Sequence, residues 1–323
     1  MISSFTIRAS ALVSMLCLSI APAQAQSAGD FHEVFTVATS EPVVLDVALS
    51  RGNLQVMYSR DGQVAITAYG QATNGGKLDA QYFKSLIAVE QRGNHIQLRD
   101  VPQTEVLQNQ KTPHYRIDVP YRTTVTSSVG IGAQAFSGIM GPVDALGGKC
   151  DIKASYLSKG LRAQVERGNL EIEVIGERVE AKTGNGNVIG TRLAQGVTAE
   201  SGDGDITLAV IGPSTATIKS GAGRIDVGGA RGTLDGSTFS GDLHVKAEPH
   251  GDWHLHSASG AVRIELSPAS KAELDASTDS GILQIDHDEI VQTPDDSRHV
   301  TQKLNGGGPH IEAHTGSGRI LIR

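Results

Sequence analysis

One short phrase returns throughout the C-terminal half of the sequence: a glycine followed by apolar residues two and four positions later. It begins at Gly168, Gly204, Gly223, Gly241, Gly260, Gly281 and Gly318, with a weaker copy at Gly186. From Gly168 to Gly281 the successive glycines are 18, 18, 19, 18, 19 and 21 residues apart, and the last interval, 37 residues, is about two units. Periodicity near 20 residues is typical of solenoid proteins, in which each repeat stacks on its neighbours.

Each unit contains two short stretches in which apolar and polar residues alternate. The second stretch follows the glycine, and the first precedes it, with the apolar pairs Val179/Ala181, Val197/Ala199, Ala216/Ile218, Trp253/Leu255 and Ala272/Leu274. Strict alternation indicates a strand with one buried face. Between the stretches lie Ser-Gly, Asp-Gly or Thr-Gly pairs, where glycine allows a sharp corner.

Two strands of this length and two corners account for about 18 residues, which is one rung of a parallel β-helix with a strand spacing of about 4.8 Å. We therefore predict an all-β protein, a parallel β-helix (solenoid) with 18–21-residue rungs. Helix should be almost absent, with one short turn near 78–84.

The N-terminal third has a different spacing. The glycine phrase occurs at Gly52 and again at Gly62, only ten residues later, which favours hairpins over rungs. We assign residues 26–125 to an antiparallel β region that caps the first rung, since an open solenoid end exposes unpaired strand edges. Residues 126–323 form the solenoid, with a polar loop or hairpin at 287–310 that covers its last rungs.

The first 25 residues have the pattern of an export signal. Arg8 precedes an apolar stretch over 11–20, and Ala23-Gln24-Ala25 matches a signal-peptidase site. We predict a signal peptide at 1–25 and an exported protein, in the periplasm or on the cell surface. We expect no transmembrane segment, because no stretch reaches the roughly 18 apolar residues that a spanning helix needs.

Composition excludes some function classes. The formal net charge is −7, so nucleic acid is not an expected partner. Of the two cysteines only Cys150 follows the signal, so no intramolecular disulfide can form. Cys150 occupies an inward position of the strand pattern and is expected to be buried as a small apolar side chain.

Three segments carry a family resemblance. These are VLDVALSRGNLQV near the start, YRIDVPYRTTV at 115–125 and HTGSGRILIR at the end, with Ser-Gly-x-Gly units between them. Together they resemble a large family of secreted bacterial β-strand-repeat proteins of unknown function, often labelled "putative adhesins". The resemblance covers about residues 30–323. It implies the fold, and it transfers no catalytic or binding residue.

Histidines suggest one candidate site. His254 and His256 flank the inward Leu255, so both imidazoles should point outward on one face. Counted from each rung's glycine, Asp235 and Asp275 fall in the same column as His254. Imidazoles with neighbouring carboxylates could hold a divalent zinc or copper ion, so His254, His256, Asp235 and Asp275 are the predicted metal ligands. The alternative is an exposed polar face that is rich in histidine.

Other motifs are weaker. Gly202-Asp203-Gly204-Asp205 resembles a calcium-binding turn, but its 18-residue spacing favours a purely structural corner. Gly184-Asn185-Gly186 lacks the lysine and helix of a phosphate-binding loop. No nucleophile elbow or His-Glu-x-x-His motif is present, so we assign no catalytic residue and no cofactor beyond the metal.

The sequence thus favours an exported, non-enzymatic β-solenoid that acts as an adhesin-like interaction or structural module at the cell envelope. An envelope protein or polysaccharide is the expected partner, and the oligomeric state is left open. Two alternatives remain: a carbohydrate-active β-helix enzyme, which would need paired carboxylates in a cleft, and a periplasmic protein that binds a divalent metal.

Overall fold

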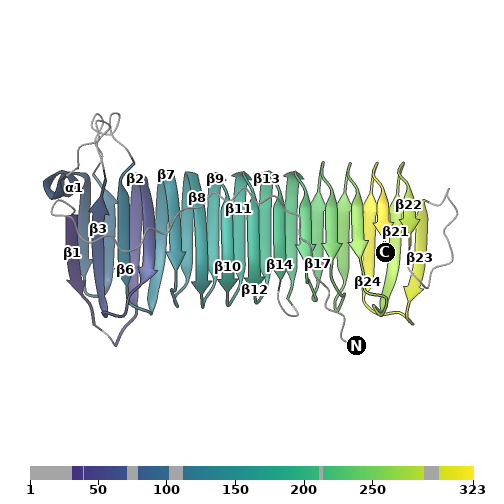
Figure 1. Cartoon of the computed structure of the whole chain (residues 1–323), viewed down its shortest axis with the longest axis horizontal. Coiled ribbons are helices and arrows are strands. Elements are labelled where there is room, and N and C mark those ends of the chain that lie inside the picture. Colours follow the sequence, from purple (N-terminus) through teal and green to yellow (C-terminus); the bar gives the residue numbers. More distant parts are fainter. Residues whose placement is uncertain (1–30, 39, 71–78, 102–111, 211–213, 287–297) are drawn as a thin grey trace, which may run out of the picture.

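The computed structural model describes residues 31–38, 40–70, 79–101, 112–210, 214–286 and 298–323. Strands lie side by side across the long axis of an elongated molecule (Figure 1). The first elements are β1 (Phe31–Thr36), β2 (Val43–Tyr58), β3 (Gln63–Tyr69), α1 (Ala80–Leu86), β4 (Ile87–Arg92), β5 (His95–Asp100), β6 (His114–Val119), β7 (Thr123–Ser137) and β8 (Val143–Leu157).

The repeats follow as β9 (Leu161–Arg167), β10 (Leu170–Ile175), β11 (Val179–Asn185), β12 (Val188–Leu193), β13 (Val197–Asp203), β14 (Ile206–Val210), β15 (Ala216–Ala222), β16 (Ile225–Gly228), β17 (Leu234–Thr238), β18 (Leu243–Lys246), β19 (Trp253–Ser257) and β20 (Val262–Glu265). The chain ends with β21 (Ala272–Thr278), β22 (Leu283–Ile285), β23 (His299–Leu304), β24 (His310–Thr315) and β25 (Ile320–Ile322).

The repeat strands form two parallel series. In the odd series β9, β11, β13, β15, β17 and β19 pair in order, and in the even series β10, β12, β14, β16, β18 and β20 do the same. We call their outward surfaces the odd face and the even face. The long strand β8 pairs with β9 through its first half and with β10 through its second, so it turns from one series into the other. The fold is a β-solenoid, as predicted.

Close stacking explains why the glycine phrase repeats. Gly204 has φ of +150°, and a Cβ built on it would lie 2.1 Å from the carbonyl oxygen of Gly186, one rung earlier. The Ser201 hydroxyl donates a hydrogen bond to that same carbonyl at 2.9 Å. The Asp205 amide donates to the Asn187 side chain at 2.9 Å. The corner therefore needs glycine for space, a hydroxyl before it and an amide or carboxylate after it.

The core lies between the two series and consists of aliphatic side chains on alternate positions. Trp253 is fully buried, as predicted, and its indole nitrogen donates to the Gly232 carbonyl at 3.1 Å. Cys150 is also buried, and burial raises the pKa of its thiol to about 11. A buried, protonated thiol is a packing group, not a nucleophile.

Antiparallel strands close the N-terminal end. β1 pairs with β3, β3 with β6, and β4 with β5, all antiparallel, while β5 and β6 join β2 in parallel. The single helix α1 begins after Asp79, whose carboxylate accepts the Tyr82 amide at 2.7 Å, and it buries Phe83 and Leu86. This is the short helical segment that the sequence predicted, and the antiparallel pairs agree with the predicted cap. Gly52 is not part of a hairpin, because it lies within β2, which pairs in parallel with β7 and places Gly52 beside Gly132.

At the C-terminal end the spatial order of strands differs from their order in the chain. β24 lies between β19 and β21, and β25 lies between β20 and β22. The 37-residue interval thus holds a rung that folds back and inserts between two earlier ones. Within the predicted loop or hairpin at 287–310, residues 287–297 lie outside the described residues, while β23 pairs antiparallel with β21. None of the described helices is long and apolar enough to span a membrane.

Candidate functional site

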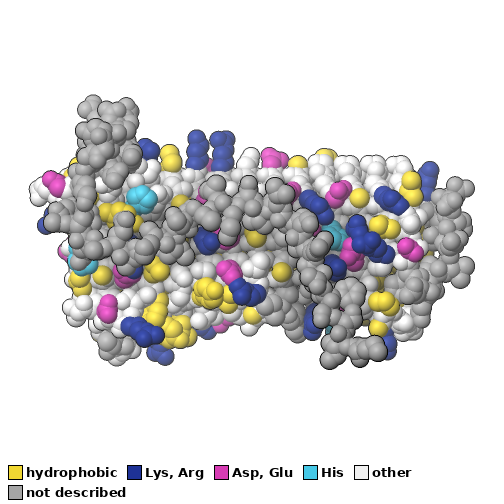
Figure 2. Space-filling model, viewed as in Figure 1, with side chains coloured by type: hydrophobic (Ala, Val, Ile, Leu, Met, Phe, Trp, Pro, Cys, Tyr) yellow, Lys and Arg dark blue, Asp and Glu magenta, His cyan; other side chains and the backbone are white. Residues whose placement is uncertain are grey.

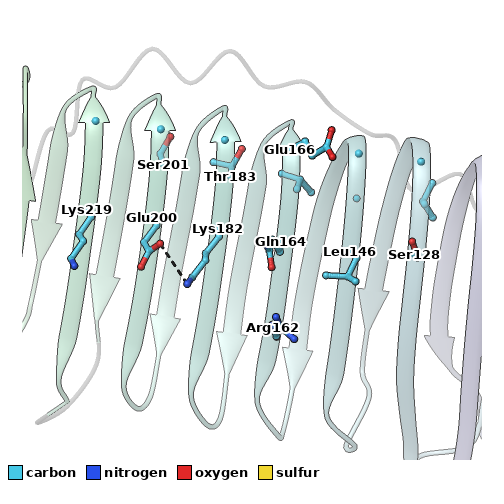
Figure 3. A pocket seen from close by; sticks show the side chains of 18 of the residues that line it. Ser128, Leu146, Arg162, Gln164, Glu166, Lys182, Thr183, Glu200, Ser201 and Lys219 are labelled. Carbon is cyan, nitrogen blue, oxygen red and sulfur yellow. Dashed lines mark ion pairs between the residues drawn. The ribbon is translucent and has the colours of Figure 1, made fainter.

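A shallow groove runs along the odd face across β7, β8, β9, β11, β13 and β15, with a cavity volume of about 880 Å³. Figure 3 shows its side chains rising from successive strands. One outward column supplies Ser128, Leu146, Gln164, Lys182, Glu200 and Lys219, and a neighbouring band is formed largely by Gly130, Gly148, Gly184, Gly202 and Gly221. We call this surface the axial groove.

The glycine band follows from the stacking of the corners. A Cβ on Gly202 would lie 2.3 Å from the Gly184 carbonyl oxygen, and one on Gly221 would lie 2.4 Å from the Gly202 oxygen. These glycines therefore have no room for a side chain, and the backbone lines that part of the groove, whereas on β9 the same band is occupied by Glu166. The band glycines Gly202 and Gly221 lie two residues before the corner glycines Gly204 and Gly223, so both sets of glycines follow the same rung repeat.

Charges of both signs line the axial groove. Lys182 lies 3.5 Å from Glu200 (Figure 3) and 3.2 Å from Glu180. The hydrogen bond that Lys182 donates to the Glu180 carboxylate is the main reason that the pKa of Lys182 is raised. These side chains are exposed, so the pairs contribute little stability. Among the described residues Lys219 has no ion-pair partner within reach, which leaves its ammonium group available.

A second hollow, of about 390 Å³, continues from the axial groove at Lys219. Its lining comes from β15, β17, β19 and β24 and includes Asp235, Ser237, His254, His256, Glu312 and His314. We call it the histidine hollow. Nδ1 of His254 lies 3.0 Å from a Glu312 carboxylate oxygen. The rings of His256 and His314 stack with centroids 5.2 Å apart and planes 4° from parallel.

The structure brings together three of the four predicted metal ligands. His254 and His256 point outward from β19, and Asp235 is the cross-strand neighbour of His254 on β17. Asp275 lies in the same column as His254, as expected, but it is not adjacent to His254. The inserted strand β24 places Glu312 between them, and Asp275 instead bonds Nε2 of His299 at 2.8 Å.

Sequence reasoning missed Glu312 and His314. A usable signal existed, because His314 lies four residues before Gly318 as His256 lies four before Gly260. That spacing places both histidines in the same column of the sheet, but it does not show that their strands are adjacent. The two histidines are 58 residues apart in the sequence. As the side chains stand, the described residues contain no group of three or more His, Cys, Asp or Glu arranged to hold a metal.

The even face carries an ion network centred on Glu265. This carboxylate lies 2.7 Å from Arg323, 2.9 Å from Arg263 and 3.3 Å from Lys246, and it also reaches His244 at 3.3 Å. Partial burial acts to raise the pKa of Glu265, but hydrogen bonds from Arg323 and Lys246 outweigh it and lower the pKa to about 2. Basic side chains gather near the C-terminal end in Figure 2. The network ties the last residue of the chain to β20.

Fold and surface together define a capped β-solenoid with a groove along one face. The chain belongs to the Toastrack DUF4097 family, whose model matches residues 43–323. No curated protein matches it.

Three solved structures are matched over most of their length at low sequence identity. A "putative cell adhesion protein" from Clostridium sporogenes is 11% identical, with 91% of this chain and 98% of that chain covered and a TM-score of 0.23. A "putative adhesin" from Bacteroides fragilis is 13% identical, with 92% and 98% covered and a TM-score of 0.27. A "putative lipid binding protein" from Parabacteroides distasonis is 11% identical, with 91% and 97% covered and a TM-score of 0.44.

Proposed function

We propose that this protein is an exported, non-enzymatic interaction module of the cell envelope that binds an extended polysaccharide along the axial groove. The observation that carries the proposal is the continuity of the groove across six neighbouring strands. Five steps between strands span about 24 Å at the usual spacing. A surface of this length, at right angles to the strands, fits a linear polymer better than a compact ligand.

The lining favours a hydrated polymer over an apolar peptide. Ser128, Gln164, Lys182, Glu200 and the exposed backbone offer hydrogen-bond donors and acceptors along the whole groove. In the outward column the only large apolar side chain is Leu146, which is 38% exposed. An apolar peptide would bury little apolar area here, whereas sugar hydroxyls can replace the water that hydrates these groups.

Binding is favoured over catalysis because the groove is shallow and open to solvent. Glycoside cleavage by a carboxylate pair depends on an acid whose pKa is raised in a protected site. Glu200 in the axial groove is instead exposed and ion-paired with Lys182. Export to the periplasm or cell surface rests on the signal peptide predicted at 1–25, which lies outside the described residues.

Co-sedimentation of the purified chain with insoluble cell-wall polysaccharide tests this function. The variant Lys182→Ala/Lys219→Ala removes two positive charges from the groove. The control Lys153→Ala/Lys159→Ala removes the same number of charges outside the groove, and Lys153 lies on the even face. We expect the wild type and the second variant to sediment with the polymer and the first variant to lose most of its binding. Equal binding by both variants, or binding to an envelope protein with none to polysaccharide, would overturn the proposal.

A further inference from the structure

Phe239 is 73% exposed, which makes it the most exposed large apolar residue in the part of the chain that the structure describes. It follows the last residue of β17, at the corner that leads to β18. The preceding residue, Thr238, is buried. Because successive side chains of a strand point to opposite faces, the phenyl ring of Phe239 leaves the odd face.

Backbone hydrogen bonds place Phe239 at one end of the axial groove. The Phe239 amide donates to the Ser220 carbonyl at 3.2 Å, and the Ser240 amide donates to the Gly221 carbonyl at 3.1 Å. Phe239 is therefore the neighbour of Gly221 in the next rung, and both Ser220 and Gly221 line the groove. Glu166 occupies the equivalent position on β9 and also lines the groove (Figure 3).

Small neighbours leave the phenyl ring uncovered. Gly221 has no side chain, and on the other side of Phe239 the next rung contributes Ala258. The Ala258 amide donates to the Thr238 carbonyl at 3.1 Å, and the Ser259 amide donates to the Phe239 carbonyl at 3.1 Å. Among the described residues no aromatic ring pair includes Phe239. The backbone thus holds Phe239 from both sides while its ring is open to a ligand.

Between Glu166 and Phe239 the band consists of Gly184, Gly202 and Gly221. Four steps between strands give this stretch a length of about 19 Å. It therefore has a bare backbone floor, a carboxylate at one end and an aromatic ring at the other. A ligand that uses the whole stretch must offer polar groups along its length and an apolar face at the Phe239 end.

A sugar ring can offer both. A pyranose whose hydroxyls are all equatorial carries its polar groups around its edge and only C–H groups on its faces. These C–H groups are slightly positive and suit the negative face of an aromatic ring. Ser237 precedes Phe239 by two residues on the same face, and Lys219 is its direct neighbour on β15. Both side chains can donate hydrogen bonds to the hydroxyls of a ring stacked on Phe239.

We propose that Phe239 is a stacking platform of the axial groove and binds the face of a pyranose ring with equatorial hydroxyls, such as β-1,4-linked N-acetylglucosamine. This role rests on the polysaccharide binding proposed above and deepens it, because it selects chains whose rings have apolar faces. An axial hydroxyl, as in mannose, places a polar group on one face of the sugar and weakens the contact with the phenyl ring.

Calorimetry with a soluble hexamer of β-1,4-linked N-acetylglucosamine tests this role. We expect Phe239→Ala and Phe239→Leu to weaken binding by about tenfold, because leucine is apolar but has no aromatic face. Phe239→Tyr keeps the ring and should bind within about twofold of the wild type. A hexamer of β-1,4-linked mannose should bind the wild type more weakly. Equal affinity of the wild type and Phe239→Leu, or of the two hexamers for the wild type, would overturn the proposal.

The matched control is Ile282→Ala, which removes another apolar side chain, 63% exposed, at the corner between β21 and β22. It should leave the affinity unchanged, and circular dichroism confirms that each variant keeps its solenoid. Co-sedimentation with cell-wall polysaccharide separates two kinds of failure. If the wild type binds neither polymer nor hexamer, the proposed function and the role of Phe239 are both wrong. If Lys182→Ala/Lys219→Ala loses binding while Phe239→Ala binds like the wild type, only the role of Phe239 is wrong.

Discussion

Single glycines at the corners determine how closely the rungs can stack. Gly204→Ala places a Cβ 2.1 Å from the Gly186 carbonyl oxygen at a backbone φ of +150°. Relief requires the two rungs to separate, so we expect a loss of at least about 2 kcal/mol in the free energy of unfolding. Urea denaturation measures this loss in the free energy of unfolding. The control Gly196→Ala meets no atom closer than 3.5 Å and should cost less than about 1 kcal/mol. Equal losses would show that close stacking is not what requires glycine.

Positions where a strand side chain points into the core do not tolerate a charged residue. Ile225 is fully buried on β16, so Ile225→Asp places a carboxylate in the core without a partner. We expect a loss of about 3 kcal/mol or more and a cooperative unfolding transition at a much lower urea concentration. Ala209→Asp on the neighbouring strand introduces the same charge at an exposed position beside Thr191 and Gly228, and it should change the midpoint little. Native stability of the Ile225→Asp variant would contradict the inward register.

At the scale of elements, Glu265 connects β20 to the end of β25. Its pKa is about 2 in the folded chain against an ordinary value of 4.5, so the folded state prefers the charged form. The stabilisation is fully present above about pH 5 and is lost as the pH falls from about 5 towards 2. We expect the urea midpoint to fall over this interval, and Glu265→Gln to reduce both the midpoint at neutral pH and its dependence on pH.

The matched control for that titration is Glu171→Gln, which breaks the exposed pair with Lys153 at 2.7 Å. A surface pair of this kind contributes at most about 1 kcal/mol, so the pH profile should keep the shape of the wild type. If Glu265→Gln and Glu171→Gln gave the same profile, the network at Glu265 would be a surface feature with no role in holding the last strand.

Much of the element structure could be predicted from the sequence, because each rung repeats the same local requirements. Alternation placed Trp253, Cys150 and Ile225 inside and His254 outside, and the glycine spacing gave the rung length. The neighbour of each rung could not be predicted in the same way. Parallel strands of similar pattern can pair with any other rung, so only the folded chain shows that β24 lies beside β19. For this reason the sequence identified Asp235, His254 and His256 of the histidine hollow and missed Glu312 and His314.

At the scale of the whole molecule, the spatial order of the rungs differs from their order in the chain. The rung made of β24 and β25 pairs with β19 and β20 on one side and with β21 and β22 on the other. The last rung of the chain is thus an internal rung of the solenoid. In repeat proteins stability is close to a sum over neighbouring interfaces, so removal of an inner rung costs two interfaces while removal of an end rung costs one.

Deletion of residues 309–323 therefore has a specific expected outcome. The preceding rungs should retain their β-sheet circular dichroism, because each is held by its own neighbours. The exposed edges of β19 and β20 should then lower the midpoint of thermal unfolding and cause self-association, since unpaired edges recruit strands from other chains. Light scattering after size-exclusion chromatography measures the second effect. Arg323→Ala keeps the rung and removes only its contact with Glu265, so that variant should stay in the oligomeric state of the wild type. A truncated chain with unchanged melting temperature and unchanged mass would mean that β21 and β22 can close directly onto β19 and β20, and that the inserted rung is dispensable for the solenoid.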